Sequence, residues 1–247
     1  MKLLAEPTVS GHAAMNFGKA LRAATQPAYW PALSRAVVPT IEHGPALTGV
    51  EPSCIIDVGA NKGQFSSFAA ARWPGVPIIA FEPLPGPAAR YRAILGNRAR
   101  LLPYALGAAE GEAEIHIASR ADSSSLRALG ARQKSIFGMD EVSTLPVAVR
   151  RLDQVVSDPD LGERALLKID VQGFEYEVLK GLGRLARSIG WVFVEVSFVE
   201  LYEGQRMHDE VDQLLREIGF EFALEHNVTM NAGELVQADR LYRNVNC

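Results

Sequence analysis

The chain has 247 residues, a formal net charge of −4 and a pI of about 5.8. Its composition, 48% hydrophobic and 22% charged, is typical of a globular protein, and its length suits one α/β domain with an extension. The acidic balance and the lack of a Lys/Arg cluster argue against a nucleic-acid partner. The two cysteines, Cys54 and Cys247, are too few for a disulfide framework and lack metal-ligand spacing, so we expect reduced thiols.

We expect neither a secretion signal nor a membrane span in this sequence. Residues 1–5 are followed by Glu6-Pro7 and are too short for a signal-peptide core. Glu195 and Glu200 interrupt the apolar run of residues 189–201, which therefore cannot cross a bilayer. The expected location is the cytoplasm, and a homodimer remains an open alternative to a monomer.

Residues 1–50 carry apolar side chains at loose helical spacing. Pro27, Pro31 and Pro39 divide this stretch into short helices. We expect a helical N-terminal extension that covers a sheet edge or, as the alternative, forms a wall of a substrate pocket. Residues 51–247 would then form a single domain.

A strand followed by a glycine-rich turn is predicted at residues 55–63. The short β-branched run at 55–58 indicates a buried strand, and Gly59 and Gly63 allow the backbone to approach a ligand closely. Strand, tight turn and helix together open a nucleotide site in α/β sheets. A dinucleotide fingerprint would need glycine at positions 61 and 64, where this chain has Asn61 and Gln64.

The rest of the chain alternates short strands with helices, which indicates an α/β sheet. Residues 118–146 lack a clear periodicity, so we expect a long loop there, of the kind that often forms a functional lid. Strands are expected at 77–83, 100–107 and 112–117, within 146–156, and at 165–170, 191–196, 220–226 and 240–246. Helices are expected at 65–73, 87–95, 174–185 and 208–218.

Four predicted strands end in a carboxylate, at Asp57, Glu82, Asp170 and Glu195. Because parallel strands end at one edge of a sheet, these acids should share a ligand site. Acids gathered there would repel one another unless they face a cation or hydroxyl groups. A sulfonium cofactor with an ammonium group and a ribose meets that condition. An acid at the end of the second strand commonly binds ribose hydroxyls, and Glu82 has that place.

Five segments resemble, in their order, the FkbM family of S-adenosylmethionine-dependent methyltransferases. They are 56–63 (IDVGANKG), 81–83 (FEP), 123–126 (SSSL), 167–181 (LKIDVQGFEYEVLKG) and 194–196 (VEV). The resemblance implies a Rossmann-like class I methyltransferase fold, with a mostly parallel sheet of about seven strands and helices on both faces. The chain departs from the family at Gln172, where glutamate is common, so the resemblance assigns no role to that residue.

The resemblance also implies roles for individual residues. S-adenosylmethionine would be held through its methionine part and nucleoside by Asp57, Gly59, Asn61 and Gly63. Glu82 would bind the ribose, Ser123 or Ser124 would approach the adenine, and Asp170 would lie beside the methyl group. Family members commonly methylate hydroxyls of sugars, glycolipids and polyketides. We expect an O-methyltransferase acting on a saccharide hydroxyl, with a polyketide or other secondary-metabolite hydroxyl as the alternative.

Deprotonation of the acceptor hydroxyl limits the possible mechanisms. A carboxylate has a pKa near 4 and an alcohol resembles water at about 15.7, so prior proton loss would cost roughly 14 kcal/mol. Either a base acts during transfer or a metal acidifies the hydroxyl. Asp170, Glu195 or a histidine such as His226 is the candidate base. In the alternative, Asp170 and Glu195, with Glu175 or His226, would bind Mg²⁺ through oxygen-rich ligands.

Two other classes of protein are alternatives to a methyltransferase. A nicotinamide-dependent oxidoreductase is disfavoured by the missing glycines at positions 61 and 64. A non-catalytic cofactor-binding protein would have no need of Asp170 at a strand end.

Overall fold

A seven-stranded sheet forms the centre of the molecule, with strands in the order β3-β2-β1-β7-β8-β10-β9. The computed structural model describes residues 9–246. Strands β3, β2, β1, β7 and β8 are parallel, and the β9–β10 hairpin adds two antiparallel strands at one edge. The order reverses at β1, where α/β sheets bind ligands. The strands are β1 (Ile55–Val58), β2 (Ile78–Phe81), β3 (Arg100–Leu102), β7 (Ala165–Ile169), β8 (Ile189–Ser197), β9 (Phe220–Asn231) and β10 (Glu234–Asn244).

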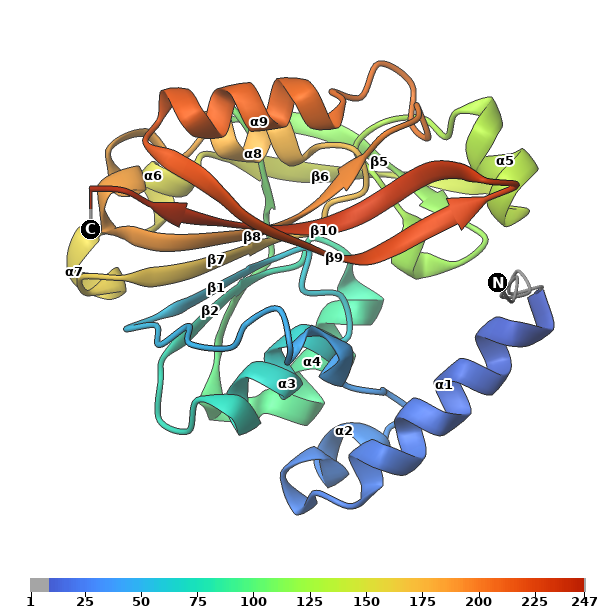
Figure 1. Cartoon of the computed structure of the whole chain (residues 1–247), viewed down its shortest axis with the longest axis horizontal. Coiled ribbons are helices and arrows are strands. Elements are labelled where there is room, and N and C mark those ends of the chain that lie inside the picture. Colours follow the sequence, from blue (N-terminus) through green and yellow to red (C-terminus); the bar gives the residue numbers. More distant parts are fainter. Residues whose placement is uncertain (1–8, 247) are drawn as a thin grey trace, which may run out of the picture.

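Helices cover both faces of this sheet (Figure 1). One face carries α3 (Gln64–Arg72) and α4 (Pro85–Leu95), and the other carries α8 (Glu175–Lys180) and α9 (His208–Glu217). The expected Rossmann-like class I fold is therefore confirmed. Short helices α6 (Leu152–Val155) and α7 (Asp158–Leu161) precede β7.

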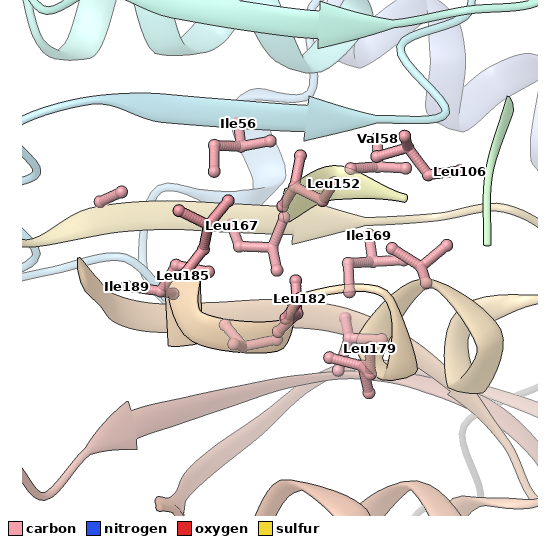
Figure 2. Packing of buried hydrophobic residues seen from close by; sticks show 14 of the residues in the cluster. Ile56, Val58, Leu106, Leu152, Leu167, Ile169, Leu179, Leu182, Leu185 and Ile189 are labelled. Atoms are coloured by element: carbon pink, nitrogen blue, oxygen red, sulfur yellow. The ribbon is translucent and has the colours of Figure 1, made fainter. Parts of the chain in front are cut away.

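The buried strands alternate their side chains between two cores. Ile56 and Leu167 point toward the α8 side, where Figure 2 shows them beside Leu182 and Leu185. Ile55, on the opposite side of β1, belongs to the cluster around the aromatic residues of α3. Because both faces are covered, the strands read as continuous apolar runs, which is why the sequence revealed them.

The N-terminal segment is helical, as expected, and it forms part of a cavity wall. It contains α1 (Val9–Ala24), η1 (Pro27–Tyr29), α2 (Trp30–Leu33) and η2 (Ile41–His43). Ala32 and Val37 pack against Tyr91 and Leu95 of α4, so this segment covers a helix layer. The domain boundary at residue 50 stays a prediction. Residues 1–8 and Cys247 lie outside the described residues.

The expectation of a long loop at 118–146 is wrong. This stretch contains η4 (Ala121–Ser123), α5 (Ala131–Phe137) and the first half of β6 (Glu141–Arg150). With β5 (Gly111–Ala118) and β4 (Ala105–Leu106), β6 forms a second sheet in the order β4-β6-β5. Residues 141–144 are exposed, so no alternation of apolar and polar side chains marked the strand.

Two further boundaries differ from those expected. The strand expected at 100–107 divides at Pro103 into β3 and β4, which belong to different sheets. The strands of the final hairpin are longer than expected, because mostly exposed residues continue β9 beyond the core. Within residues 9–246, no helix combines the length and apolar character needed to traverse a bilayer.

Candidate functional site

A cavity of about 610 Å³ opens at the carboxyl ends of β1, β2 and β7. Its volume lies within the range of small-molecule and cofactor sites. The small sheet contributes Ala105, Leu106 and Ile115 to its lining, and residues 122–126 line it as well. The N-terminal segment and the β9–β10 hairpin complete the wall through Val37, Thr40, His43, Asn227, Thr229 and Gln237. The cavity therefore joins parts of the chain that are far apart in sequence.

The turn after β1 gives the cavity its first wall. Gly59 has φ of +76°, and a Cβ there would collide with the carbonyl oxygen of Asp170. Glycine is thus required for the close approach of the turns after β1 and β7. Asn61 also lies in the left-handed region, with φ of +47°, although it has a side chain. Such backbone strain is often found at ligand sites.

Glu82 lies at the end of β2, on the cavity wall, as the sequence indicated. Its Oε1 accepts from the Leu84 N–H at 2.7 Å, and its Oε2 accepts from the Asn61 N–H at 2.9 Å. These bonds fix the carboxylate, and each oxygen retains a lone pair for a ligand hydroxyl. Burial raises the pKa of Glu82 to about 7.

Asp57 and Gly63 lie behind the cavity wall and do not line it. Asp57 is fully buried, and its Oδ2 accepts from Ser66 Oγ at 2.6 Å. Gly63 begins α3 with φ of +89° and contacts the side chains of Tyr91 and Leu95. Both residues shape the turn, whereas the resemblance implied a direct contact with the cofactor.

Lys168 is a buried cation that the sequence reading missed. Its Nζ lies 3.5 Å from Asp57 Oδ1 and 3.5 Å from Asp170 Oδ2. Burial lowers the pKa of Lys168, but the carboxylates of Asp170 and Asp57 raise it above its ordinary value. The acids at this edge therefore face a cation from the protein itself. Its place two residues before Asp170, on the same side of β7, was the available signal.

Asp170 and Glu195 come together at the cavity, as expected. The Nε2 of Gln172 donates to Asp170 Oδ1 at 2.7 Å and to Glu195 Oε2 at 3.1 Å. Gln237 donates to the same Glu195 oxygen at 2.8 Å. Burial and the nearby carboxylate of Asp170 raise the pKa of Glu195 well above its usual value.

These contacts do not fit the expected Mg²⁺ site. The oxygens of Asp170 and Glu195 that would bind a cation already accept from the amide of Gln172. Within residues 9–246, no three His, Cys, Asp or Glu side chains group as metal ligands. Glu175 lies nearby, but its Oε1 accepts from the backbone N–H groups of Val171 and Gly173.

His226 does not line the cavity. Its Nε2 lies 2.8 Å from the carbonyl oxygen of Glu42, a contact that uses this nitrogen. The structure therefore separates His226 from Asp170 and Glu195, with which the sequence reading grouped it. Its proposed catalytic role remains without a supporting contact.

A different histidine, His43, lines the cavity and was not considered from the sequence. Its Nε2 lies 3.4 Å from Asp239 Oδ2, and its Nδ1 is buried without a hydrogen-bond partner. Asp239 also accepts from Asn227 Nδ2 at 3.0 Å. No sequence motif surrounds His43, so only the fold could reveal this pair.

Ser123 and Ser124 line the cavity opposite the main sheet. Ser124 Oγ accepts from the Ala118 N–H at 3.3 Å, which holds the segment against β5. Neighbouring Ser125 is buried, and its Oγ donates to the Gln172 carbonyl oxygen at 2.6 Å. Leu106, at the end of β4, provides apolar lining for a flat ring.

The sheet order, the glycine turn and the acid after β2 define a class I methyltransferase. A family profile described as the methyltransferase FkbM domain matches residues 57–222, which is most of the chain. The chain therefore belongs to the FkbM family of S-adenosylmethionine-dependent O-methyltransferases, and the resemblance seen in the sequence is confirmed. This membership overturns the alternative of a nicotinamide-dependent oxidoreductase.

Curated relatives share between 24% and 30% of their aligned residues with this chain. The 2-O-methyltransferase NoeI of Sinorhizobium fredii is 30% identical over 61% of the chain and 66% of that protein. The 31-O-demethyl-FK506 methyltransferase FkbM of Streptomyces tacrolimicus is 28% identical, over 74% and 78% respectively. The hexuronic acid methyltransferase AglP of Haloferax volcanii is 24% identical, over 72% of each. The chain spans only 10% of another relative, the AMB antimetabolite synthetase AmbE of Pseudomonas aeruginosa.

Proposed function

We propose that this protein transfers a methyl group from S-adenosylmethionine to a hydroxyl of a saccharide. The observation that supports this proposal is the cavity, which is lined by Glu82 after β2 and, on the other side of β1 in the sheet, by Asp170 after β7 and Glu195 in β8. The cofactor supplies an electrophilic methyl group when bound. The protein's own residues hold the two reactants and move the proton.

The donor end of the cavity fits a nucleoside. The fixed carboxylate of Glu82 is suited to two vicinal ribose hydroxyls, since both of its oxygens are held in place and retain lone pairs. Leu106 and Ser124 face that end and would contact the adenine. The turn at Asn61, whose backbone is left-handed, would hold one side of the nucleoside and the methionine part of S-adenosylmethionine.

The acceptor end is lined by amide and hydroxyl side chains. Asn227, Thr229 and Gln237 reach it from the β9–β10 hairpin, and Glu195 lies beside them. Amides and hydroxyls can both donate to and accept from hydroxyl groups, which suits a saccharide. The hexuronic acid methyltransferase AglP is a relative whose name records a sugar substrate.

Asp170 is the proposed general base. Its Oδ1 is held by Gln172, and its Oδ2 lies beside Lys168 at the cavity wall. Because a carboxylate is far too weak a base to remove an alcohol proton beforehand, Asp170 would accept the proton while the methyl group moves. Positioning of acceptor and donor in line would supply much of the rate.

A hydroxyl of a polyketide or other secondary metabolite is the second candidate acceptor. Phe137 and Met139 also line the cavity and offer apolar contact. The FK506 methyltransferase is a relative that acts on such a compound by name. The cytoplasm remains the proposed location, and a homodimer remains an untested alternative.

Labelled methyl transfer to a panel of saccharides and macrolides tests the acceptor. We expect transfer to a saccharide that survives EDTA, with O-methylation shown by mass spectrometry. Asp170→Asn should reduce kcat about 10²–10⁴-fold while adenosylhomocysteine binding persists. Transfer only to macrolides would replace the saccharide assignment, and undiminished transfer by the Asn variant would remove Asp170 from its role.

A further inference from the structure

Gln172 occupies an unusual backbone conformation at the cavity. Its φ is +57°, in the left-handed region that residues with side chains seldom adopt. Ser125 Oγ donates to its carbonyl oxygen at 2.6 Å, which ties the turn to the opposite wall. A strained residue held at a ligand site by its surroundings is a reason to ask what its side chain does.

The side-chain amide of Gln172 bridges the two cavity carboxylates. Its Nε2 lies 2.7 Å from Asp170 Oδ1 and 3.1 Å from Glu195 Oε2, so both N–H groups have a carboxylate partner. Asp170 directly follows β7 and Glu195 lies in β8, so the amide connects two neighbouring strands of the sheet.

Tyr202 fixes which end of the amide faces the carboxylates. This buried hydroxyl lies 2.7 Å from Gln172 Oε1 and accepts from Gln133 Nε2 at 2.5 Å. The phenol accepts from Gln133, and its single proton faces two acceptors, the Gln172 oxygen at 2.7 Å and the Ser123 carbonyl oxygen at 3.1 Å, of which the Gln172 oxygen is nearer. The amide therefore cannot rotate to present its oxygen to Asp170 without breaking the contact with Tyr202.

Other groups approach the pair from outside and leave the space between the two acids to Gln172. Lys168 lies 3.5 Å from the other oxygen of Asp170, and the neutral amide of Gln237 donates to Glu195 at 2.8 Å. Two neighbouring carboxylates repel each other, and a cation or a proton relieves that repulsion. Lys168 supplies a cation to Asp170 only, and the neutral amide of Gln172 bridges the two acids, at hydrogen-bond distances longer than the metal–oxygen distances of about 2.0–2.6 Å for Mg²⁺ and Ca²⁺.

We propose that Gln172 is a positioning residue that replaces a divalent cation between Asp170 and Glu195 and aims the Asp170 carboxylate at the acceptor. The inference deepens the proposed methyl transfer and rests on it for its kinetic consequences. Its structural consequence, exclusion of a cation from this pair, stands independently of catalysis. Glutamate at position 172 would bring three carboxylates together, with those of Asp170 and Glu195, and these could bind a divalent cation.

A pair of matched glutamine variants tests the positioning role. Gln172→Met removes the bridge to Asp170 and Glu195, whereas Gln213→Met removes an exposed amide on α9 whose partner is Glu217. We expect Gln172→Met to lower kcat about 10–100-fold with the donor KM little changed, and Gln213→Met to leave kcat within about twofold of wild type. Equal losses in the two variants, or wild-type kcat in Gln172→Met, would overturn the positioning role.

Manganese binding tests the replacement of a cation without any assay of activity. Electron paramagnetic resonance should detect no bound Mn²⁺ in the wild-type protein and a bound ion in the nearly isosteric Gln172→Glu variant. The double variant Asp170→Asn/Gln172→Glu should lose it again. Wild-type binding that depends on Asp170, or no binding by Gln172→Glu, would contradict the proposal.

Chemical rescue connects the two experiments. Mg²⁺ should restore part of the kcat lost in Gln172→Glu and none of that lost in Gln172→Met, and rescue of neither variant would count against the replacement. If the wild-type protein methylates no acceptor tested, the proposed function fails while the Mn²⁺ measurements still decide whether Gln172 excludes a cation.

Discussion

Lys168 and Asp57 form a buried ion pair beside the glycine turn after β1, with Lys168 Nζ 3.5 Å from Asp57 Oδ1. Asp57 is fully buried and Lys168 nearly so, so neither charge is hydrated from bulk solvent. The same ammonium reaches Asp170 at the cavity, 3.5 Å away. One cation thus connects the acid that shapes the turn after β1 with the acid proposed to act in catalysis.

Removal of Lys168 should destabilise the protein strongly. Lys168→Met keeps most of the apolar volume but leaves the Asp57 carboxylate buried without its cation. We expect the free energy of unfolding to fall by about 3–5 kcal/mol, measured by urea denaturation. In Lys168→Met/Asp57→Asn the unpaired charge is absent, so at least half of that loss should be recovered. A single variant within about 1 kcal/mol of wild type would show that the pair contributes little.

A methyl group at Gly59 should disrupt the turn. Its Cβ would collide with the Asp170 carbonyl oxygen at a φ of +76°, so Gly59→Ala should cost about 3 kcal/mol of stability and abolish donor binding. Gly75 is the matched control, because it has φ of +85° with open space around it. Gly75→Ala should cost only about 1 kcal/mol. Thermal unfolding and calorimetry with adenosylhomocysteine would measure both, and equal losses would exclude the collision as the cause.

Donor affinity should rise with pH through the titration of Glu82. Burial raises the pKa of Glu82 to about 7 in the unliganded protein, and hydroxyls that donate to it favour the ionised form. Affinity for adenosylhomocysteine should therefore increase about tenfold between about pH 6 and pH 8. Calorimetry at several pH values would measure this, and Glu82→Gln should bind more weakly without that dependence. A flat profile for the wild-type protein would place the ribose elsewhere.

Ionisation of the buried Glu175 carboxyl group should make the folded protein less stable as pH rises. Burial raises its pKa from an ordinary value of 4.5 to about 7, so the folded state retains a proton that the unfolded state loses. This contribution to stability is fully present below about pH 4.5 and is lost as pH rises from there through about 7. Glu175→Gln keeps the acceptor for Val171 and Gly173, so it should be about 2 kcal/mol more stable than wild type at pH 8 and equal at pH 5.

Urea denaturation at the two pH values measures the Glu175 effect. Glu221→Gln, which alters an exposed carboxylate on β9, should leave stability within about 0.5 kcal/mol of wild type at both. If the difference in stability between Glu175→Gln and wild type is the same at pH 8 as at pH 5, the burial of Glu175 does not control its titration.

The positions of the buried strands could be predicted from the sequence for a physical reason. A strand covered on both faces must be apolar throughout, so residues 55–58 and 165–169 could be recognised without knowledge of their partners. The half-exposed strand β5 was recognised from its alternating residues, whereas the first half of β6 was taken for a loop because residues 141–144 are all exposed and do not alternate. No local feature of the sequence indicated that these strands pair with β4 in a second sheet.

The sequence by itself determined the α/β architecture, the glycine turn at residues 59–63, and the meeting of Glu82, Asp170 and Glu195 at one sheet edge. Strand ends and turn glycines are local features of a sequence, which is why these could be predicted. Only the tertiary structure decided which side chains face the cavity. It turned Asp57 inward to Lys168, removed His226 from the site, brought in His43, and set the amide of Gln172 between two carboxylates. Those relationships depend on side-chain directions across strands and loops distant in the chain, which no local pattern of residues specifies.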